Sequence, residues 1–249
     1  MFKRKILSKL EAWKQDERHK PLILRGARQV GKTTVVNEFG SQFDNYLYFN
    51  LEMSESVRLF EMDIPLNDLV NMLFASLGKS QKEGSTLIFI DEIQNSPKTI
   101  ALLRYFYEQR PDLYVIAAGS LLENLVDVNV SFPVGRVMYL ALRPCSFYEF
   151  LGAIGKNNLL TILSQKAEYS IAFHEQLMHQ FNQYTIIGGM PEAVQHYAET
   201  QDIIAIEDVY ETLVQAYKHD SEKYARSNKL TDVVRFILSY GWAFSGETI

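Results

Sequence analysis

The sequence is poor in cysteine and has no long apolar run. Cys145 is the single cysteine among 249 residues, which excludes an intrachain disulfide and a cysteine-based zinc site. No stretch reaches the roughly 18 apolar residues that a membrane-spanning helix needs. The basic start of the chain is not followed by the apolar run of about 7–15 residues that a secretory signal requires. We therefore expect a cytoplasmic protein without a membrane span.

Charge is distributed unevenly along the chain. The formal net charge is −5, and hydrophobic residues make up 47% of the sequence, as in ordinary globular proteins. Residues 1–150 hold 18 basic and 18 acidic side chains, whereas residues 151–249 hold 7 and 12. Because contacts with phosphate need positive charge, the acidic second part is a poor candidate for a dedicated nucleic-acid surface.

The first 150 residues alternate short apolar runs with helical spacing, a pattern typical of βαβ units around a parallel sheet. The helical spacing predicts helices at Lys32–Gly40, Leu66–Leu77 and Lys98–Gln109. We expect an α/β core over residues 1–145. The apolar runs predict five strands, at Pro21–Arg25, Asn45–Leu51, Thr86–Asp91, Leu113–Ala118 and Val137–Leu142.

Beyond residue 145 the apolar spacing is helical throughout. Ser146 and Glu149 form a capping box, which predicts that a helix begins there. Further apolar stripes predict helices around 209–217 and over Thr231–Phe244. We therefore expect a helical region at 146–249. Its last five residues read as a turn and a new helix start, which suggests that the region is truncated.

One motif decides the chemistry. The segment Gly26–Thr33 satisfies G-x-x-x-x-G-K-[ST] and lies between a predicted strand and a predicted helix. In such a loop the glycines let backbone N–H groups surround a phosphate, the lysine reaches the β- and γ-phosphates, and the threonine hydroxyl ligates Mg²⁺. Lys32 and Thr33 take these two roles. The candidate nucleotide-binding residues are Gly26, Ala27, Arg28, Gln29, Val30, Gly31, Lys32, Thr33 and Thr34.

A second motif follows the strand at Thr86–Asp91. Its apolar run is typical of a buried parallel strand and ends in two carboxylates, Asp91 and Glu92. Ligands of α/β folds bind at the carboxyl ends of such strands. We expect Asp91 to hold the Mg²⁺ shell with Thr33, and Glu92 to activate the attacking water. The plainer interpretation is a solvated acidic turn.

Other classes of P-loop protein fit less well. GTPases carry D-x-x-G after this strand, but the residue three places after Asp91 is Gln94. The only segment similar to the guanine-binding N-K-x-D is Asn228–Asp232, which is one residue too long. A P-loop kinase acting on a small molecule stays open as an alternative, although an Asp-Glu pair suits water activation better.

The sequence resembles the bacterial and archaeal AAA-type, STAND-like P-loop ATPases that carry an uncharacterised C-terminal region. The resemblance rests on Gly26–Thr33, Ile88–Gln94 and Leu142–Leu151 and covers essentially the whole chain. It implies a five-stranded parallel P-loop NTPase core, an all-helical lid region and the start of a winged helix. It also implies that Ser120 senses the γ-phosphate, unless it only caps a helix. Pro191, in a Gly-x-Pro turn, would lie beside the adenine, unless the turn is ordinary helix punctuation.

Several weaker signals remain. Arg136 and Arg143 flank the fifth predicted strand, and either could be an arginine finger or a surface ion pair; we favour Arg136 as the catalytic one. The basic cluster at residues 3–5 reads as a solvated terminus. His174 and His179 are five residues apart, so they do not share a helix face as zinc ligands would.

We expect an ATPase that binds ATP and Mg²⁺ and couples hydrolysis to a conformational change. The alternative from another class is a nucleotide-dependent switch or scaffold with little turnover. Beyond ATP and ADP, the expected partners are a second copy of the chain and an unknown protein or DNA partner that binds through the missing C-terminal region.

Overall fold

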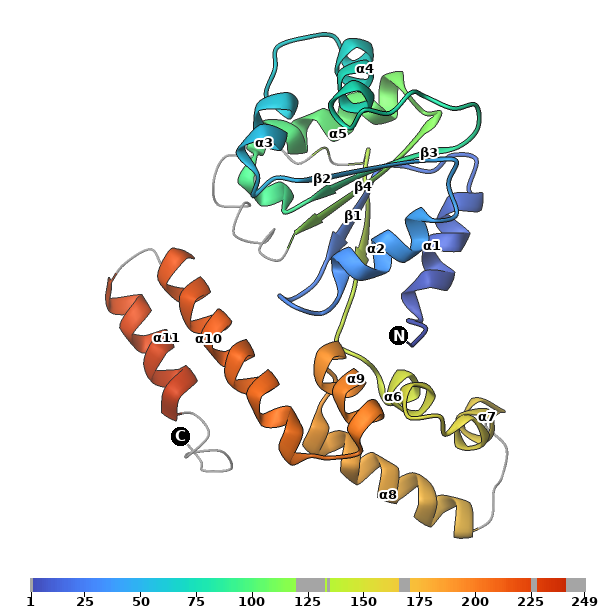
Figure 1. Cartoon of the computed structure of the whole chain (residues 1–249), viewed down its shortest axis with the longest axis vertical. Coiled ribbons are helices and arrows are strands. Elements are labelled where there is room, and N and C mark those ends of the chain that lie inside the picture. Colours follow the sequence, from blue (N-terminus) through green and yellow to red (C-terminus); the bar gives the residue numbers. More distant parts are fainter. Residues whose placement is uncertain (1, 120–132, 134, 166–170, 225–227, 241–249) are drawn as a thin grey trace. The chain divides into compact units, whose positions relative to one another are not determined.

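The structure is a computed structural model that describes residues 2–119, 133, 135–165, 171–224 and 228–240 (Figure 1). It divides into two compact units, Phe2–Glu149 and the chain from Phe150 onward. The elements of the first unit, in chain order, are α1 (Ile6–Gln15), β1 (Leu22–Arg25), α2 (Lys32–Gly40), β2 (Asn45–Asn50), α3 (Ser54–Phe60), α4 (Leu66–Ser76), β3 (Thr86–Asp91), the 3₁₀ helix η1 (Ile93–Asn95), α5 (Pro97–Gln109), β4 (Leu113–Gly119) and β5 (Met138–Ala141).

The first unit is built on a five-stranded sheet in the order β2-β3-β4-β1-β5, with every neighbouring pair parallel. The interior strand β3 is buried along its whole length, whereas burial alternates along the edge strand β2. This difference matches their sequences, because a strand covered on both faces reads as a continuous apolar run. All five carboxyl ends point to one edge of the sheet, and β1 leads there directly into the loop before α2.

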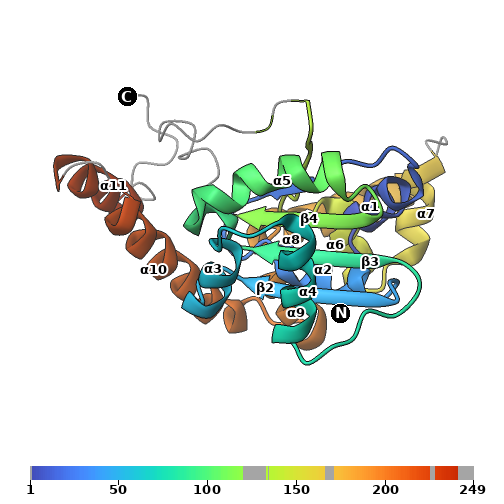
Figure 2. The same ribbon diagram turned by 90° about the horizontal axis from the view of Figure 1, so that it is seen from above.

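Helices cover both faces of this sheet (Figure 1 and Figure 2). Helices α3, α4 and α5 pack on one face, where Phe60, Leu73 and Phe106 join the buried side chains of β2 and β3 in the main core. Helices α1 and α2 lie against the other face and bury Leu10 and Phe39 completely. Burying one side chain of this size contributes about 1.5–3 kcal/mol to the free energy of folding. The two helical layers therefore fix the positions of the strands between them.

The second unit is helical. Helix α8 ends at Ile187, where Gly188 has a left-handed φ of +72° and donates its N–H to the Tyr184 carbonyl. The aromatic rings of Phe150, Tyr184 and Tyr197 pack together in this unit. No helix in the described ranges is long and apolar enough to cross a membrane. The elements from residue 147 onward are α6 (Phe147–Ala153), which spans the division, α7 (Asn157–Gln165), α8 (Ile171–Ile187), α9 (Pro191–Thr200), η3 (Ile204–Ile206), α10 (Glu207–Tyr224) and α11 (Asn228–Tyr240).

The predicted fold class is confirmed: an α/β P-loop NTPase core with a five-stranded parallel sheet precedes a helical region. The predicted start of a winged helix falls mostly on residues 241–249, outside the described residues. Helices α1 and α3 are additions that the sequence analysis did not predict. In α1 the residues Ile6, Leu7, Leu10 and Trp13 form a buried stripe at helical spacing.

Candidate nucleotide site

The loop that joins β1 to α2 has the backbone of a phosphate cradle. Gln29 and Gly31 both have left-handed φ angles, +62° and +86°, and Gly31 is the residue before the first turn of α2. A Cβ added to Gly26 would lie 2.4 Å from the Leu142 carbonyl oxygen, so only glycine fits between this loop and the end of β5. The loop thus presents backbone N–H groups and a helix N-terminus at one place, as an anion site requires.

Lys32 is positioned inside this loop. Its side chain is 6% exposed, and its ammonium donates to the carbonyls of Gly26 at 2.9 Å and Ala27 at 3.0 Å. Burial lowers the pKa of Lys32, while the carboxylates of Glu92 and Asp91 act to raise it. In the part of the chain that the structure describes, the hydrogen bonds of this ammonium go to neutral carbonyls, and a phosphate could replace them with an oppositely charged partner.

The two motifs meet at the edge formed by the strand ends. The Thr33 hydroxyl donates to the Asp91 carboxylate over 2.6 Å, although the two residues lie 58 positions apart in the chain. Asp91 is 3% exposed, and burial raises the pKa of its carboxyl while the Thr33 hydrogen bond and Lys32 act to lower it. A hydroxyl and a buried carboxylate form the oxygen donor set that suits Mg²⁺.

Glu92 has an unusual backbone. Its φ of +53° is left-handed, which is uncommon for a residue with a long side chain and typical of functional sites. The Gln94 amide donates to the Glu92 carboxylate. Burial raises the pKa of Glu92; the Gln94 hydrogen bond opposes the shift and the Asp91 charge adds to it. A carboxyl group whose pKa is raised toward neutrality is better suited to accept a proton from water.

Tyr48, on the neighbouring strand β2, faces the same acidic cluster. Burial raises the pKa of its hydroxyl, and the nearby charges of Asp91 and Glu92 raise it further. The Tyr48 hydroxyl is protonated at neutral pH, as tyrosine ordinarily is, and it interacts with the Asp91 carboxylate. Neither Tyr48 nor Gln94 was predicted as a site residue. Tyr48 lies on β2 opposite Phe89, and Gln94 lies in η1, three residues after Asp91, so no motif marks either of them.

The other predicted residues lie elsewhere. Ser120 is outside the described residues. Pro191 is the first residue of α9, and the φ of Gly188 and the helix start at Pro191 give this turn the geometry of helix punctuation. Its contact with nucleotide remains a prediction.

The structure places Arg136 at the amino ends of the strands, whereas the loop lies at their carboxyl ends. Arg136 precedes β5, whose first residue pairs with the start of β1, whereas the loop follows the end of β1. Four paired residues, roughly 13 Å at 3.3 Å each, therefore separate Arg136 from the loop of its own chain. Its guanidinium forms an ion pair with Glu108 on α5, with 2.5 Å between Nε and Oε1. Any role as an arginine finger would have to be toward a second copy of the chain.

The interpretation of residues 3–5 as a solvated terminus is wrong for Arg4, which is only 6% exposed, although Lys3 and Lys5 are exposed. Nothing in the local sequence signals this, since the burial depends on where the tertiary fold places the start of α1.

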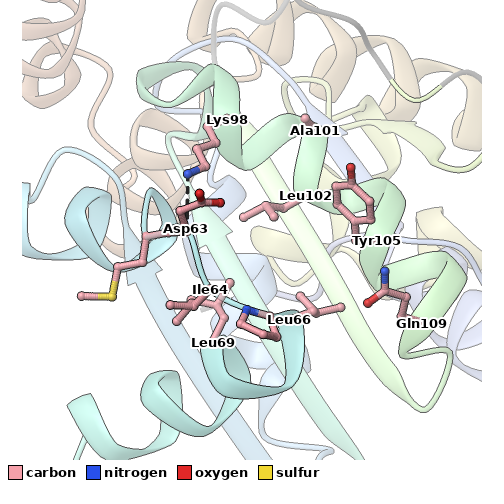
Figure 3. Close-up of a pocket in the computed structure, with 11 residues that line it drawn as sticks. Asp63, Ile64, Leu66, Leu69, Lys98, Ala101, Leu102, Tyr105 and Gln109 are labelled. Atoms are coloured by element: carbon pink, nitrogen blue, oxygen red, sulfur yellow. Dashed lines mark hydrogen bonds between the residues drawn. The ribbon is translucent and has the colours of Figure 1, made fainter.

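A separate hollow of about 480 Å³ lies between the start of α4 and α5 (Figure 3). Ile64, Leu69 and Leu102 form its apolar lining, and Lys98 and Gln109 lie toward its two ends (Figure 3). None of the predicted site residues lines it, and it has no phosphate-binding loop, so it is distinct from the candidate nucleotide site.

The sequence profile of the AAA domain family matches residues 18–151, more than half of the chain. The chain belongs to the AAA domain family. This match contains the cradle loop, Asp91 and Glu92 and supports an AAA-type P-loop ATPase fold. A second profile, a domain of unknown function (DUF8612), matches residues 178–243 in the helical region. No curated protein matches the chain.

One solved structure supports the fold. The Walker-type ATPase PABY2304 of Pyrococcus abyssi aligns over 100% of this chain and 85% of its own, with 18% identity and a TM-score of 0.56. Two weaker likenesses are PCH-2 of C. elegans (12% identity, 80% and 63% covered, TM-score 0.44) and Drosophila ORC bound to DNA (14%, 97% and 67%, 0.42). Only the first has a TM-score above 0.5, and at 18% identity it supports the fold alone.

Proposed function

We propose that the chain binds ATP with Mg²⁺ at Gly26–Thr34 and hydrolyses the bond between its β- and γ-phosphates to give ADP and phosphate, with Glu92 as the residue that activates water. The observation that carries this proposal is the 2.6 Å hydrogen bond from Thr33 to Asp91, which joins the cradle loop to the acidic strand end. Glu92 follows Asp91 directly, so base, metal donors and loop lie at one edge of the sheet.

The residues present fit the ligand. The site between Gly26 and Leu142 has no room for a side chain, and Lys32 points its charge at carbonyl oxygens within the loop. When bound, Mg²⁺ would neutralise charge on the β- and γ-phosphates. Thr33 and Asp91 would hold it, Lys32 would bind the phosphates, and Glu92 would orient a water and take its proton.

The rival function is a nucleotide-dependent switch with little turnover. The hydrogen bond from Gln94 to the Glu92 carboxylate favours it, because a carboxylate held in this way is partly satisfied and a weaker base. Phosphate release at saturating ATP separates the two functions. Sustained release supports the hydrolase, whereas tight binding without release supports the switch.

The test of nucleotide binding is Lys32→Ala. Titration with a fluorescent ATP analogue should show a large loss of affinity with an unchanged fold. Lys98→Ala is the matched control, since this exposed lysine also donates to backbone carbonyls, those of Glu61 and Met62, but lies outside the site. Equal affinities and equal turnover for wild type and Lys32→Ala would refute the proposal.

A further inference from the structure

Arg4 lies just before α1 and uses all three guanidinium nitrogens. Nη1 donates to the Val30 carbonyl at 3.0 Å, and Nη2 donates to the Arg143 carbonyl at 2.7 Å. Nε donates to Oε1 of Glu149 at 2.9 Å, and both side chains of this ion pair are less than a tenth exposed. The three acceptors come from the cradle loop, from the segment after β5 and from the start of α6.

The carboxylate that balances Arg4 is itself fully engaged. Glu149 accepts from the backbone N–H and hydroxyl of Ser146 at 2.8 and 2.9 Å and from the N–H of Lys5 at 2.9 Å. Burial acts to raise the pKa of Glu149, but the hydrogen bonds from Ser146, Lys5 and Arg4 lower it on balance. The pair is therefore charged at neutral pH and firmly anchored, unlike a surface ion pair.

The hydrogen bond from Arg4 to the Val30 carbonyl fixes the orientation of a peptide unit in the cradle loop. The Val30 carbonyl and the Gly31 N–H belong to one planar trans peptide unit, so they point in opposite directions. Holding the carbonyl toward Arg4 therefore turns the Gly31 N–H away from Arg4. Val30 also lies between two residues with left-handed φ, Gln29 and Gly31, a conformation that needs support from its surroundings.

We propose that Arg4 is a positioning residue for the phosphate loop: it fixes the peptide between Val30 and Gly31 and anchors the loop to the Glu149 carboxylate. The idea that this improves nucleotide binding rests on the proposed function. The anchoring itself does not, because it concerns the loop in the absence of nucleotide. Only arginine can do this, since the single ammonium of lysine cannot reach three diverging acceptors.

The experiment measures two quantities in the full chain: amide hydrogen exchange of residues 26–33 without nucleotide, and the affinity for a fluorescent ATP analogue. Three variants are compared. Arg4→Lys keeps the buried positive charge and is therefore the variant most certain to fold. Arg4→Met removes that charge, and Arg4→Met combined with Glu149→Gln also removes the negative charge that would otherwise be left unpaired. Arg104→Met is the matched control, because it breaks an exposed ion pair with Glu108 on α5.

We expect loop exchange to accelerate about tenfold or more in the Arg4 variants, with β3 and α5 unchanged, because local opening becomes easier. Affinity for the analogue should fall by a similar factor, while Arg104→Met matches wild type in both. If Arg4→Lys and the double variant keep wild-type loop exchange, the inference is overturned, even where the melting temperature falls. If wild type binds no analogue, the proposed function fails, and the exchange data alone decide the role of Arg4.

Discussion

The Thr33 hydroxyl and the Asp91 carboxylate are 2.6 Å apart, and this contact brings together the two motifs that define the candidate site. Thr33 is in the first turn of α2, and Asp91 is the last residue of β3. Neither element could move along its axis without breaking the hydrogen bond. The contact thus ties the geometry of a metal site to the packing of α2 against the sheet.

Asp91→Asn should raise the Mg²⁺ concentration needed for half-maximal ATP hydrolysis by roughly 10–100-fold, the usual effect of weakening a metal's supporting shell. The amide can still accept the Thr33 hydrogen bond, so the fold should survive while the charge is lost. A magnesium titration of phosphate release measures the shift. Asp68→Asn, on an exposed position of α4, is the control. An identical magnesium dependence in Asp91→Asn and wild type would exclude Asp91 from the metal site.

Glu92→Gln should leave nucleotide affinity intact and slow hydrolysis by roughly 10²–10⁴-fold, the usual contribution of a general base. The left-handed backbone and the Gln94 contact would persist, because glutamine has the same shape. Single-turnover phosphate release measures the rate, and the ATP-analogue titration checks binding. Wild-type turnover in this variant would mean that Glu92 is structural, which would favour the switch.

The same substitution should stabilise the protein without nucleotide at neutral pH. Burial raises the folded-state pKa of Glu92 above its ordinary value of 4.5, so the folded state favours the protonated form. Stability from this group is present below about 4.5 and is lost as the pH rises through the folded pKa. Glu92→Gln should therefore melt a few degrees higher at pH 7–8, and the gain should vanish near pH 4.5. Glu83→Gln, in the exposed loop before β3, should change little at any pH. A gain that grows on acidification would contradict this reasoning.

Gly26→Ala tests the close contact of the cradle loop with the segment after β5. The added Cβ would meet the Leu142 carbonyl at 2.4 Å, and since that neighbour is backbone, the loop must shift. We expect a loss of about 1–3 kcal/mol in stability together with weaker ATP binding. Gly152→Ala is the control, because its Cβ meets nothing within 4 Å in α6 and should stabilise by about 0.5–1 kcal/mol. Denaturant unfolding measures the stability of both variants. If Gly26→Ala loses no more stability than Gly152→Ala, the close contact between Gly26 and Leu142 does not constrain the loop.

The fold was predictable because its signals are local. The run ending at Asp91 is apolar because β3 is buried on both faces, and the capping box at Ser146 and Glu149 forms as expected at the start of α6. The cradle loop follows β1 and precedes α2, as its motif requires.

The misses concern tertiary placement. Arg4 has the same local signature as a solvated arginine, and its burial comes with hydrogen bonds to residues far along the chain. The position of Arg136 could have been predicted from the sequence, because a residue that precedes a parallel strand lies at the amino ends of the strands. Which edge meets a neighbour's nucleotide, however, depends on an assembly that one chain does not define.

The last prediction is that full activity needs a second copy of the chain. Stabilising the transition state of phosphate transfer usually calls for one more cation, worth about 10³–10⁵ in rate when supplied by a neighbour. Arg136 is 40% exposed at its side chain and lies at the edge away from its own cradle loop, so it could act only in trans. Specific activity should therefore rise with protein concentration. Mixing Arg136→Ala with Lys32→Ala should recover part of the activity. In a mixed pair, the intact cradle loop of the Arg136→Ala chain can face the intact Arg136 of the Lys32→Ala chain. Arg104→Ala, which removes the other partner of Glu108, controls for loss of the surface ion pair alone. Activity that is independent of concentration, with no recovery in the mixture, would exclude Arg136 as a finger.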